Sequence, residues 1–131
     1  MSKTLDTAAS ITVSTDGTVP AEEFWVQSSG LVAGAVKHGM NVEIKATFAD
    51  NAAVEGDLTF YTVGSNDAGT TITSAAQAKP FAVFTPVQNT TVIAVVEVPT
   101  VYGDSIGFAV QNEDETYSAT AVTIKYKTVI L

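Results

Sequence analysis

The stretch TTVIAVVEV, residues 90–98, constrains the fold of this chain more than any other part of the sequence. Successive side chains of an extended strand point to opposite faces, so Val92 and Val96 face one way while Ile93 and Val95 face the other. A strand that is apolar on both faces is typical of a sheet covered on both sides. The β-branched residues and the flanking prolines favour a strand over a buried helix. We therefore expect residues 90–98 to form a central strand.

Alternation of apolar and polar residues predicts two further strands. Along residues 41–49 every second side chain is apolar, namely Val42, Ile44, Ala46 and Phe48. Along residues 117–131 the same holds for Val122, Ile124, Tyr126 and Ile130. Each pattern is that of a strand with one buried face and one polar face.

The spacing of turn signals predicts the fold class. Segments rich in Gly, Asn and Asp separate short apolar segments at intervals of roughly 8 to 12 residues, which predicts roughly eight to ten strands. Only short helical turns fit between them, for example at residues 19–23. We expect an all-β chain: a single-domain antiparallel β-sandwich, jelly-roll-like, at residues 9–131, preceded by an extended or mobile arm at residues 1–8.

The charge balance excludes one class of partner. The chain has fourteen acidic residues, six Lys and no Arg, which gives a net charge of −8. Such a chain repels phosphate backbones and lacks the forked side chain that reads them, so we expect no nucleic-acid partner. Charged residues make up only 15% of the sequence, against about 25% in an ordinary soluble domain. A surface so sparsely charged favours self-assembly, although a Thr-rich monomer stays open.

No segment predicts a membrane span, a leader or a covalent crosslink. The longest apolar run, residues 92–96, is far shorter than the roughly 20 residues that cross a bilayer, so we expect no membrane partner. The first ten residues lack the apolar run of a signal peptide. Because cysteine is absent, stability must come from packing alone.

Few residues could carry chemistry. His38, the only histidine, lies in a His-Gly turn without a nucleophile elbow, where a solvated imidazole is the ordinary explanation. Acidic loops at residues 50–57 and 112–115 offer oxygen atoms to calcium, but neither has the spacing of a dedicated site, and solvated turns explain both. We expect no enzyme and assign no catalytic, cofactor-binding or metal-binding residue.

Aromatic residues suggest one alternative function. Trp25, Tyr61, Tyr102 and Tyr117 could form an exposed platform on which sugars stack. Single aromatic residues in strands more often belong to a core or an interface. A carbohydrate-binding β-sandwich module is therefore the main alternative to an assembly role.

The whole chain resembles the small β-sandwich decoration, or cement, proteins that coat the heads of tailed bacteriophages. The resemblance lies in the polar arm MSKTLDTAAS, the turn-rich VSTDGTVPAEEF and the Thr/Ala/Val-rich strands that end in TAVTIKYKTVIL. It implies a non-enzymatic virion protein on the capsid exterior, which binds the major capsid protein and stabilises the head. It also implies a homo-oligomer, with a trimer favoured.

Residues near both ends of the chain are the predicted interface. An extended arm can add a strand to a neighbouring molecule, which points to Thr4 and Leu5. Alternation puts Ile130 in the core and puts Val129 and Leu131 on the opposite face, where a neighbouring subunit would cover them.

The assignment of Ile130 to the core face and of Val129 to the opposite face leads to a first prediction. Ile130→Asp should lower the free energy of unfolding of the isolated domain by several kcal/mol, because it buries an unpaired charge. Val129→Asp, as the matched variant, should mainly impair assembly. Thermal denaturation measures the first effect, and an unchanged midpoint for Ile130→Asp would contradict the predicted register.

Overall fold

The computed structural model describes residues 4–5, 9–13, 16–27, 32–33, 40–48, 56–65, 79–85, 90–98, 105–115 and 117–130. Ten strands and no helix lie in these ranges, so no described helix could cross a membrane. The strands are β1 (Thr4–Leu5), β2 (Ala9–Thr12), β3 (Phe24–Val26), β4 (Val32–Ala33), β5 (Met40–Phe48), β6 (Leu58–Ser65), β7 (Lys79–Phe84), β8 (Thr91–Val98), β9 (Ser105–Asn112) and β10 (Ala119–Ile130). The all-β prediction is confirmed.

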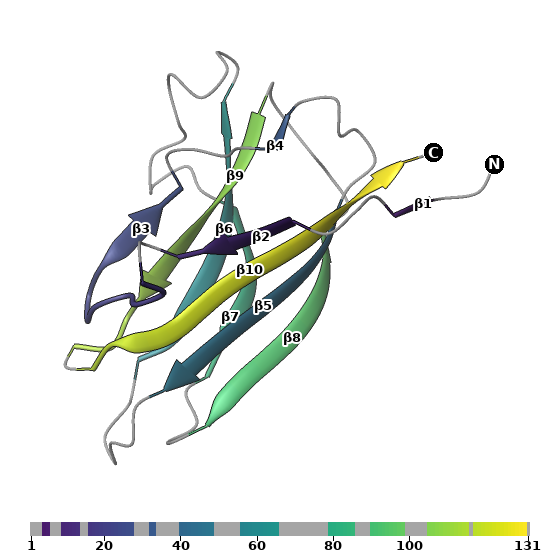
Figure 1. The fold of residues 1–131 in the computed structure, drawn as a ribbon. Helices are drawn as coiled ribbons and strands as arrows, with labels where there is room; N and C mark the ends of the chain where they lie inside the picture. Colours follow the sequence, from purple (N-terminus) through teal and green to yellow (C-terminus); the bar gives the residue numbers. More distant parts are fainter. Residues whose placement is uncertain are drawn as a thin grey trace.

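The strands form two antiparallel sheets that face each other (Figure 1). The first sheet has the order β1-β10-β5-β8, and β2 also pairs with β10. The second has the order β3-β9-β6-β7, and β4 also pairs with β9. From β5 onward the chain repeatedly crosses between the sheets, so strands distant in sequence become neighbours. This is the predicted sandwich with jelly-roll-like pairing.

The core lies between the two sheets. Alternate residues of β5, from Met40 to Phe48, are buried, while the residues between them are only partly buried. Phe60 and Phe108 come from the second sheet and are completely buried. The ring of Phe108 lies 5.8 Å from that of Tyr126 on β10, a contact that joins the sheets. The alternation predicted for residues 41–49 is confirmed, as it is for Val122 and Ile124 of β10.

The prediction that residues 90–98 form a central strand is wrong. β8 pairs with β5 alone and ends the first sheet, and its burial alternates along its length. Val92, Ala94 and Val96 pack against the core, whereas Ile93 and Val95 are 58% and 60% exposed. No described residue covers the outer face of β8. The outer face of β8 is therefore apolar, although no described strand packs over it.

The structure differs from the expected helical turn at residues 19–23. These residues form a non-helical turn, in which the Glu23 amide donates to the Pro20 carbonyl at 3.2 Å and Glu22 has a left-handed φ of 63°. Within the predicted arm, Thr4 and Leu5 form β1 and pair with Ile130 and Val129 of the same chain. Residues 1–3 and 6–8 lie outside the described ranges.

Candidate functional site

The structure describes the backbone of three of the four predicted interface residues. Thr4 and Val129 lie on the neighbouring strands β1 and β10, with Leu5 directly opposite Val129 in the register. Leu131 lies outside the described residues, as do His38 and Tyr102. The backbone therefore brings Thr4, Leu5 and Val129 to one end of the first sheet, and their role in an interface stays a prediction.

The two acidic loops meet at one end of the sandwich. The Gly56 amide donates to Asp114 Oδ2 at 3.1 Å, and the Glu113 amide donates to the Asp57 carbonyl at 2.9 Å. Asp114 is only 3% exposed, and its other carboxylate oxygen accepts from the Tyr117 amide at 2.7 Å. Buried Asn112 donates to the carbonyls of Val19 and Tyr117. Asp114 is thus a buried turn-forming carboxylate and not the solvated one that the sequence suggested.

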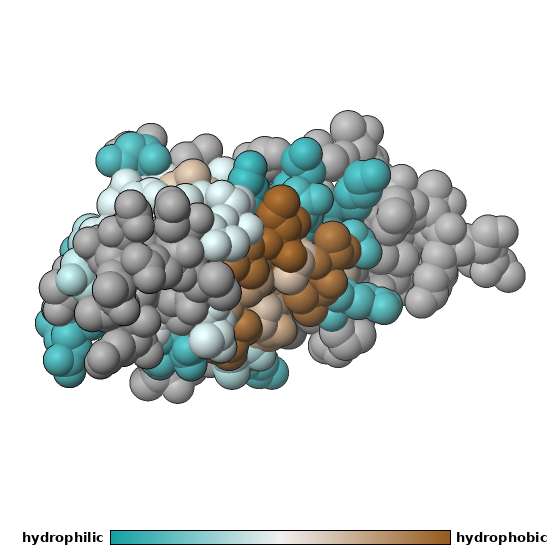
Figure 2. Space-filling model, turned by 90° about the horizontal axis from the view of Figure 1, so that it is seen from below, coloured by the Kyte–Doolittle hydropathy of each residue, from teal (hydrophilic) through white to brown (hydrophobic). Residues whose placement is uncertain are grey.

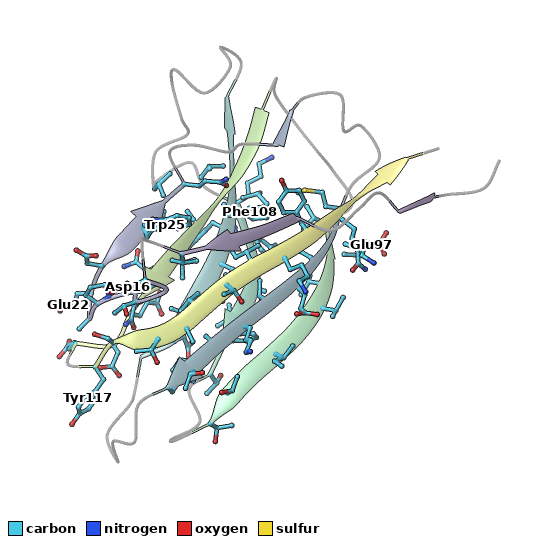
Figure 3. All side chains as sticks on the ribbon, viewed as in Figure 1. Asp16, Glu22, Trp25, Glu97, Phe108 and Tyr117 are labelled. Atoms are coloured by element: carbon cyan, nitrogen blue, oxygen red, sulfur yellow. The ribbon has the colours of Figure 1, made fainter. Side chains whose placement is uncertain are left out.

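Seven acidic residues among those that the structure describes lie at this acidic end, and they form no metal site. Its seven members are Asp16, Glu22, Glu23, Asp57, Glu113, Asp114 and Glu115. No three acidic or histidine side chains among the described residues are grouped so that they could hold a metal ion. The acidic end lies beside the start of β10, two strands away from β8 (Figure 3).

The aromatic residues do not gather into one platform. Trp25 packs against the core, and Tyr117 lies in the turn at the acidic end (Figure 3). Because Trp25 and Phe60 point inward, their neighbours Phe24 and Tyr61 point to the outer face of the second sheet. The rings of Phe24 and Tyr61 lie 5.6 Å apart at an angle of 54°. Of the predicted sugar platform, only Tyr61 among the described residues lies on an outer face beside another aromatic ring, and that ring belongs to Phe24, which was not predicted.

Burial changes the pKa of one further aromatic side chain. Tyr126 is half-buried against Phe108, and desolvation raises the pKa of its hydroxyl above the ordinary value for tyrosine. Its phenol therefore stays neutral at physiological pH, and its ring packs against the core.

The most prominent surface feature is an apolar side formed by β7 and β8. Val83 of β7 is 55% exposed, and Ile93 and Val95 of β8 are exposed slightly more. These are the only large apolar side chains among the described residues that are exposed to this degree. Figure 2 shows apolar surface gathered in one continuous patch on the face seen from below. We call the surface of Val83, Ile93 and Val95 the open side.

The two sheets do not close over the core at the open side. β7 and β8 end their respective sheets and contact each other. Five further apolar residues on these strands pack against the core but stay partly exposed: Phe81, Ala82, Val92, Ala94 and Val96. Apolar surface therefore continues from the core to the solvent between the two edges.

The polar outer face of the first sheet adjoins the open side. Cross-strand rows place Lys125 beside Glu43 and Glu43 beside Val95. The next row places Lys127 beside Asn41. These five residues line a small open pocket of about 160 Å³. With Lys45 and Glu97, this face carries three lysines and two glutamates, so it is far less acidic than the chain as a whole.

Sequence reasoning found these residues but not their role. The apolar character of Ile93 and Val95 was visible, yet an apolar second face does not reveal whether the same chain covers it. Val83 gave no signal, because its exposure depends on β7 being the last strand of its sheet.

The solved structures that match include two modules whose alignment covers nearly the whole chain. One is the C-terminal CBM6 of a marine laminarinase from Zobellia galactanivorans, with 14% identity, a TM-score of 0.46 and coverage of 92% of this chain and 91% of that one. The other is a carbohydrate-binding module of a Cellvibrio mixtus lichenase in complex with cellotriose, with 12% identity, a TM-score of 0.46 and coverage of 95% and 89%. No protein-family model and no curated protein matches the chain.

The acidic end generates a prediction about stability. A Cβ atom at Gly56 would overlap the backbone nitrogen of Asp114 and the backbone carbonyl carbon of Glu113. Gly56→Ala should therefore lower the free energy of unfolding by about 3 kcal/mol, because backbone atoms must move apart. Chemical denaturation measures the loss. Glu115→Ala, an exposed change in the same turn, should be nearly neutral, and equal stability of the two variants would contradict the packing described.

Proposed function

We propose that this chain is a non-catalytic structural protein that works by assembling with other protein through its open side. The observation that carries the proposal is the exposure of Val83, Ile93 and Val95 on the last strands of both sheets. Ile93 and Val95 lie together on the outer face of β8, and exposed apolar surface of this kind marks interaction sites in soluble proteins. Burying such a side chain from full exposure is worth about 1.5 to 3 kcal/mol, so a partner that covers the exposed parts of these two side chains gains roughly 2 to 4 kcal/mol.

The finer form of the proposal is a decoration protein on the exterior of a tailed-bacteriophage head. In this form the chain binds the major capsid protein and copies of itself, and the virion is its location. Two features support it: a β-sandwich without described metal-binding groups, and a side of aliphatic instead of aromatic residues. Exposed β-branched side chains suit contact with a protein surface better than stacking on a sugar ring.

Binding to heads tests this form. Heads assembled from the major capsid protein of the same genome should bind the chain and sediment with it. Val95→Lys should reduce the bound amount by at least about tenfold, because desolvating a lysine at the contact costs more than 1.4 kcal/mol even with Glu43 beside it. Both Val95 and Thr120 are exposed, so Val95→Lys and the charge-matched control Thr120→Lys should keep the thermal midpoint of the wild type.

Each other outcome removes a part of the proposal. Equal binding by Val95→Lys and Thr120→Lys would show that the open side is not the attachment surface. A wild-type chain that does not sediment with heads, or a genome without a major capsid gene, would contradict the decoration role.

A second candidate is a carbohydrate-binding module, favoured by the Phe24–Tyr61 pair. In the register, Phe24 lies opposite Gln111, and Ala109 lies between Val26 and Tyr61. The pair therefore flanks a half-buried amide on the outer face of the second sheet. An aromatic ring beside a polar side chain is the minimal arrangement that binds a sugar face and its hydroxyls.

Affinity electrophoresis tests this second candidate. Soluble neutral polysaccharides are the appropriate probes, because a chain of net charge −8 repels acidic ones. If the Phe24–Tyr61 pair binds sugar, the gel should retard the wild type, and Tyr61→Ala should abolish the retardation. Tyr117→Ala, at the acidic end, should leave it unchanged. A wild type that no neutral polysaccharide retards would rule this candidate out.

A further inference from the structure

The free edge of β8 has a defined set of unused backbone groups. The Phe48 amide donates to the Thr90 carbonyl at 3.1 Å, which fixes the phase of hydrogen bonding between β5 and β8. Because bonded and non-bonded pairs alternate in an antiparallel ladder, Val92, Ala94 and Val96 bond toward β5. The odd-numbered residues from Thr91 to Glu97 direct their N–H and C=O groups away from β5. No described strand pairs with that edge.

The open side also differs between its two strands in how each edge is protected. Proteins blunt exposed strand edges with lysine, proline and bulges. β7 has all three: Lys79 and Pro80 are exposed at its start, and its pairing with β6 contains a bulge. β8 has neither lysine nor proline, and its only charged residue is Glu97 near its end. An eight-residue edge without these devices is suited to pairing.

We propose that β8 pairs antiparallel with β8 of a second copy of this chain, with Ile93 of each copy opposite Val95 of the other. The pairing rests on the proposed function, because it names the protein that covers Ile93 and Val95, the β8 part of the open side. In this register Thr91 lies opposite Glu97, so all four odd-numbered residues pair with one another. Each of the four pairs exchanges two backbone hydrogen bonds, which makes about eight. The first sheets of both copies then form one continuous sheet.

Side chains fit this register as well as the backbone does. On the outer face, Ile93 meets Val95 twice, so the most exposed apolar residues of β8 cover one another. Glu97 meets Thr91, and the two Glu97 carboxylates lie six residues apart along the strands, which is about 20 Å. This exceeds the Debye length of about 8 Å in physiological salt, so their repulsion is largely screened.

The distribution of charge permits a second copy despite the net charge of −8. The acidic end lies two strands away from β8, and the outer face of the first sheet carries Lys45, Lys125 and Lys127 against Glu43 and Glu97. Two copies that join at β8 therefore keep their acidic ends on the far sides of the pair. The least acidic part of each copy faces the seam.

A single cysteine tests the pairing directly. The chain has no cysteine of its own, so an introduced thiol is the only one present. In the proposed register Ala94 lies opposite Ala94 as a non-hydrogen-bonded pair, with Cα atoms about 4.5 Å apart, within the range that a disulfide bridges. Under mild oxidation with diamide, Ala94→Cys should form a covalent dimer at least tenfold faster than Thr120→Cys. Adding Val95→Lys to Ala94→Cys should suppress the crosslink.

Sedimentation equilibrium provides a readout that does not depend on the cysteine variant. The wild type should dimerise, and Val95→Lys should raise the dimer dissociation constant at least tenfold, while Thr120→Lys leaves it unchanged. If folded Ala94→Cys crosslinks no faster than Thr120→Cys, the register is overturned. If the wild type is a monomer at about 100 µM, self-pairing is overturned.

The binding assay with heads separates this inference from the proposed function. A monomeric wild type whose binding to heads is lost in Val95→Lys overturns self-pairing but supports assembly through the open side with another protein. A wild-type dimer that crosslinks at Ala94→Cys but does not bind heads supports self-pairing and contradicts the decoration role. A monomer that does not bind heads overturns both.

Discussion

Packing of one apolar face against another between the two sheets is the interaction on which the rest of this structure depends. The chain has no disulfide and the described residues include no metal-binding group, so this contact is the main one that holds the sheets together, beside hydrogen bonds such as that from Asn112 to the Val19 carbonyl. Phe108 is central to it: its ring contacts Phe81 in its own sheet at 6.0 Å and Tyr126 in the other sheet at 5.8 Å. Strands from distant parts of the chain must therefore be in place before any surface is complete.

The features predicted correctly from sequence are those that depend on burial of one strand face. β5 is the clearest case, because its alternation is regular and its inward residues from Met40 to Phe48 are all buried. β10 follows the same rule at Val122 and Ile124. In both strands one face is polar, so only one orientation of the strand is compatible with a core. Fold class follows from such strands and from the turns between them.

The position of β8 could not be predicted in the same way. Alternation reports which face of a strand is apolar, but it carries no information about how many strands lie beside it. Ile93 and Val95 have the composition of core residues, and only the pairing of β8 with β5 alone reveals that they are at the surface. The error is informative, because β8 has the composition of a strand that is covered on both faces, yet the described residues cover only one of its faces.

The buried state of Asp114 could not be predicted for a different reason. Gly56 and Asp114 are 58 residues apart, and only the register of β6 against β9 brings their turns together. Asp114, which looks solvated in its own loop, is buried where the two turns meet, because the Gly56 amide donates to its carboxylate and the Glu113 amide donates to the Asp57 carbonyl. Pairings of this range depend on the whole topology and leave no local trace in the sequence.

The uneven distribution of charge connects these observations. The chain has only six lysines, so few are available to protect the edge strands of the two sheets. The structure shows on which strands they lie. Lys79 lies on the edge strand β7, and Lys45, Lys125 and Lys127 lie on the inner strands β5 and β10 of the other sheet, while β8 receives none. A lysine at position 93 or 95 would cost the isolated domain almost nothing, because both side chains are more than half exposed. Stability of the isolated domain therefore does not account for Ile93 and Val95, whereas the proposed coverage of β8 by another protein would.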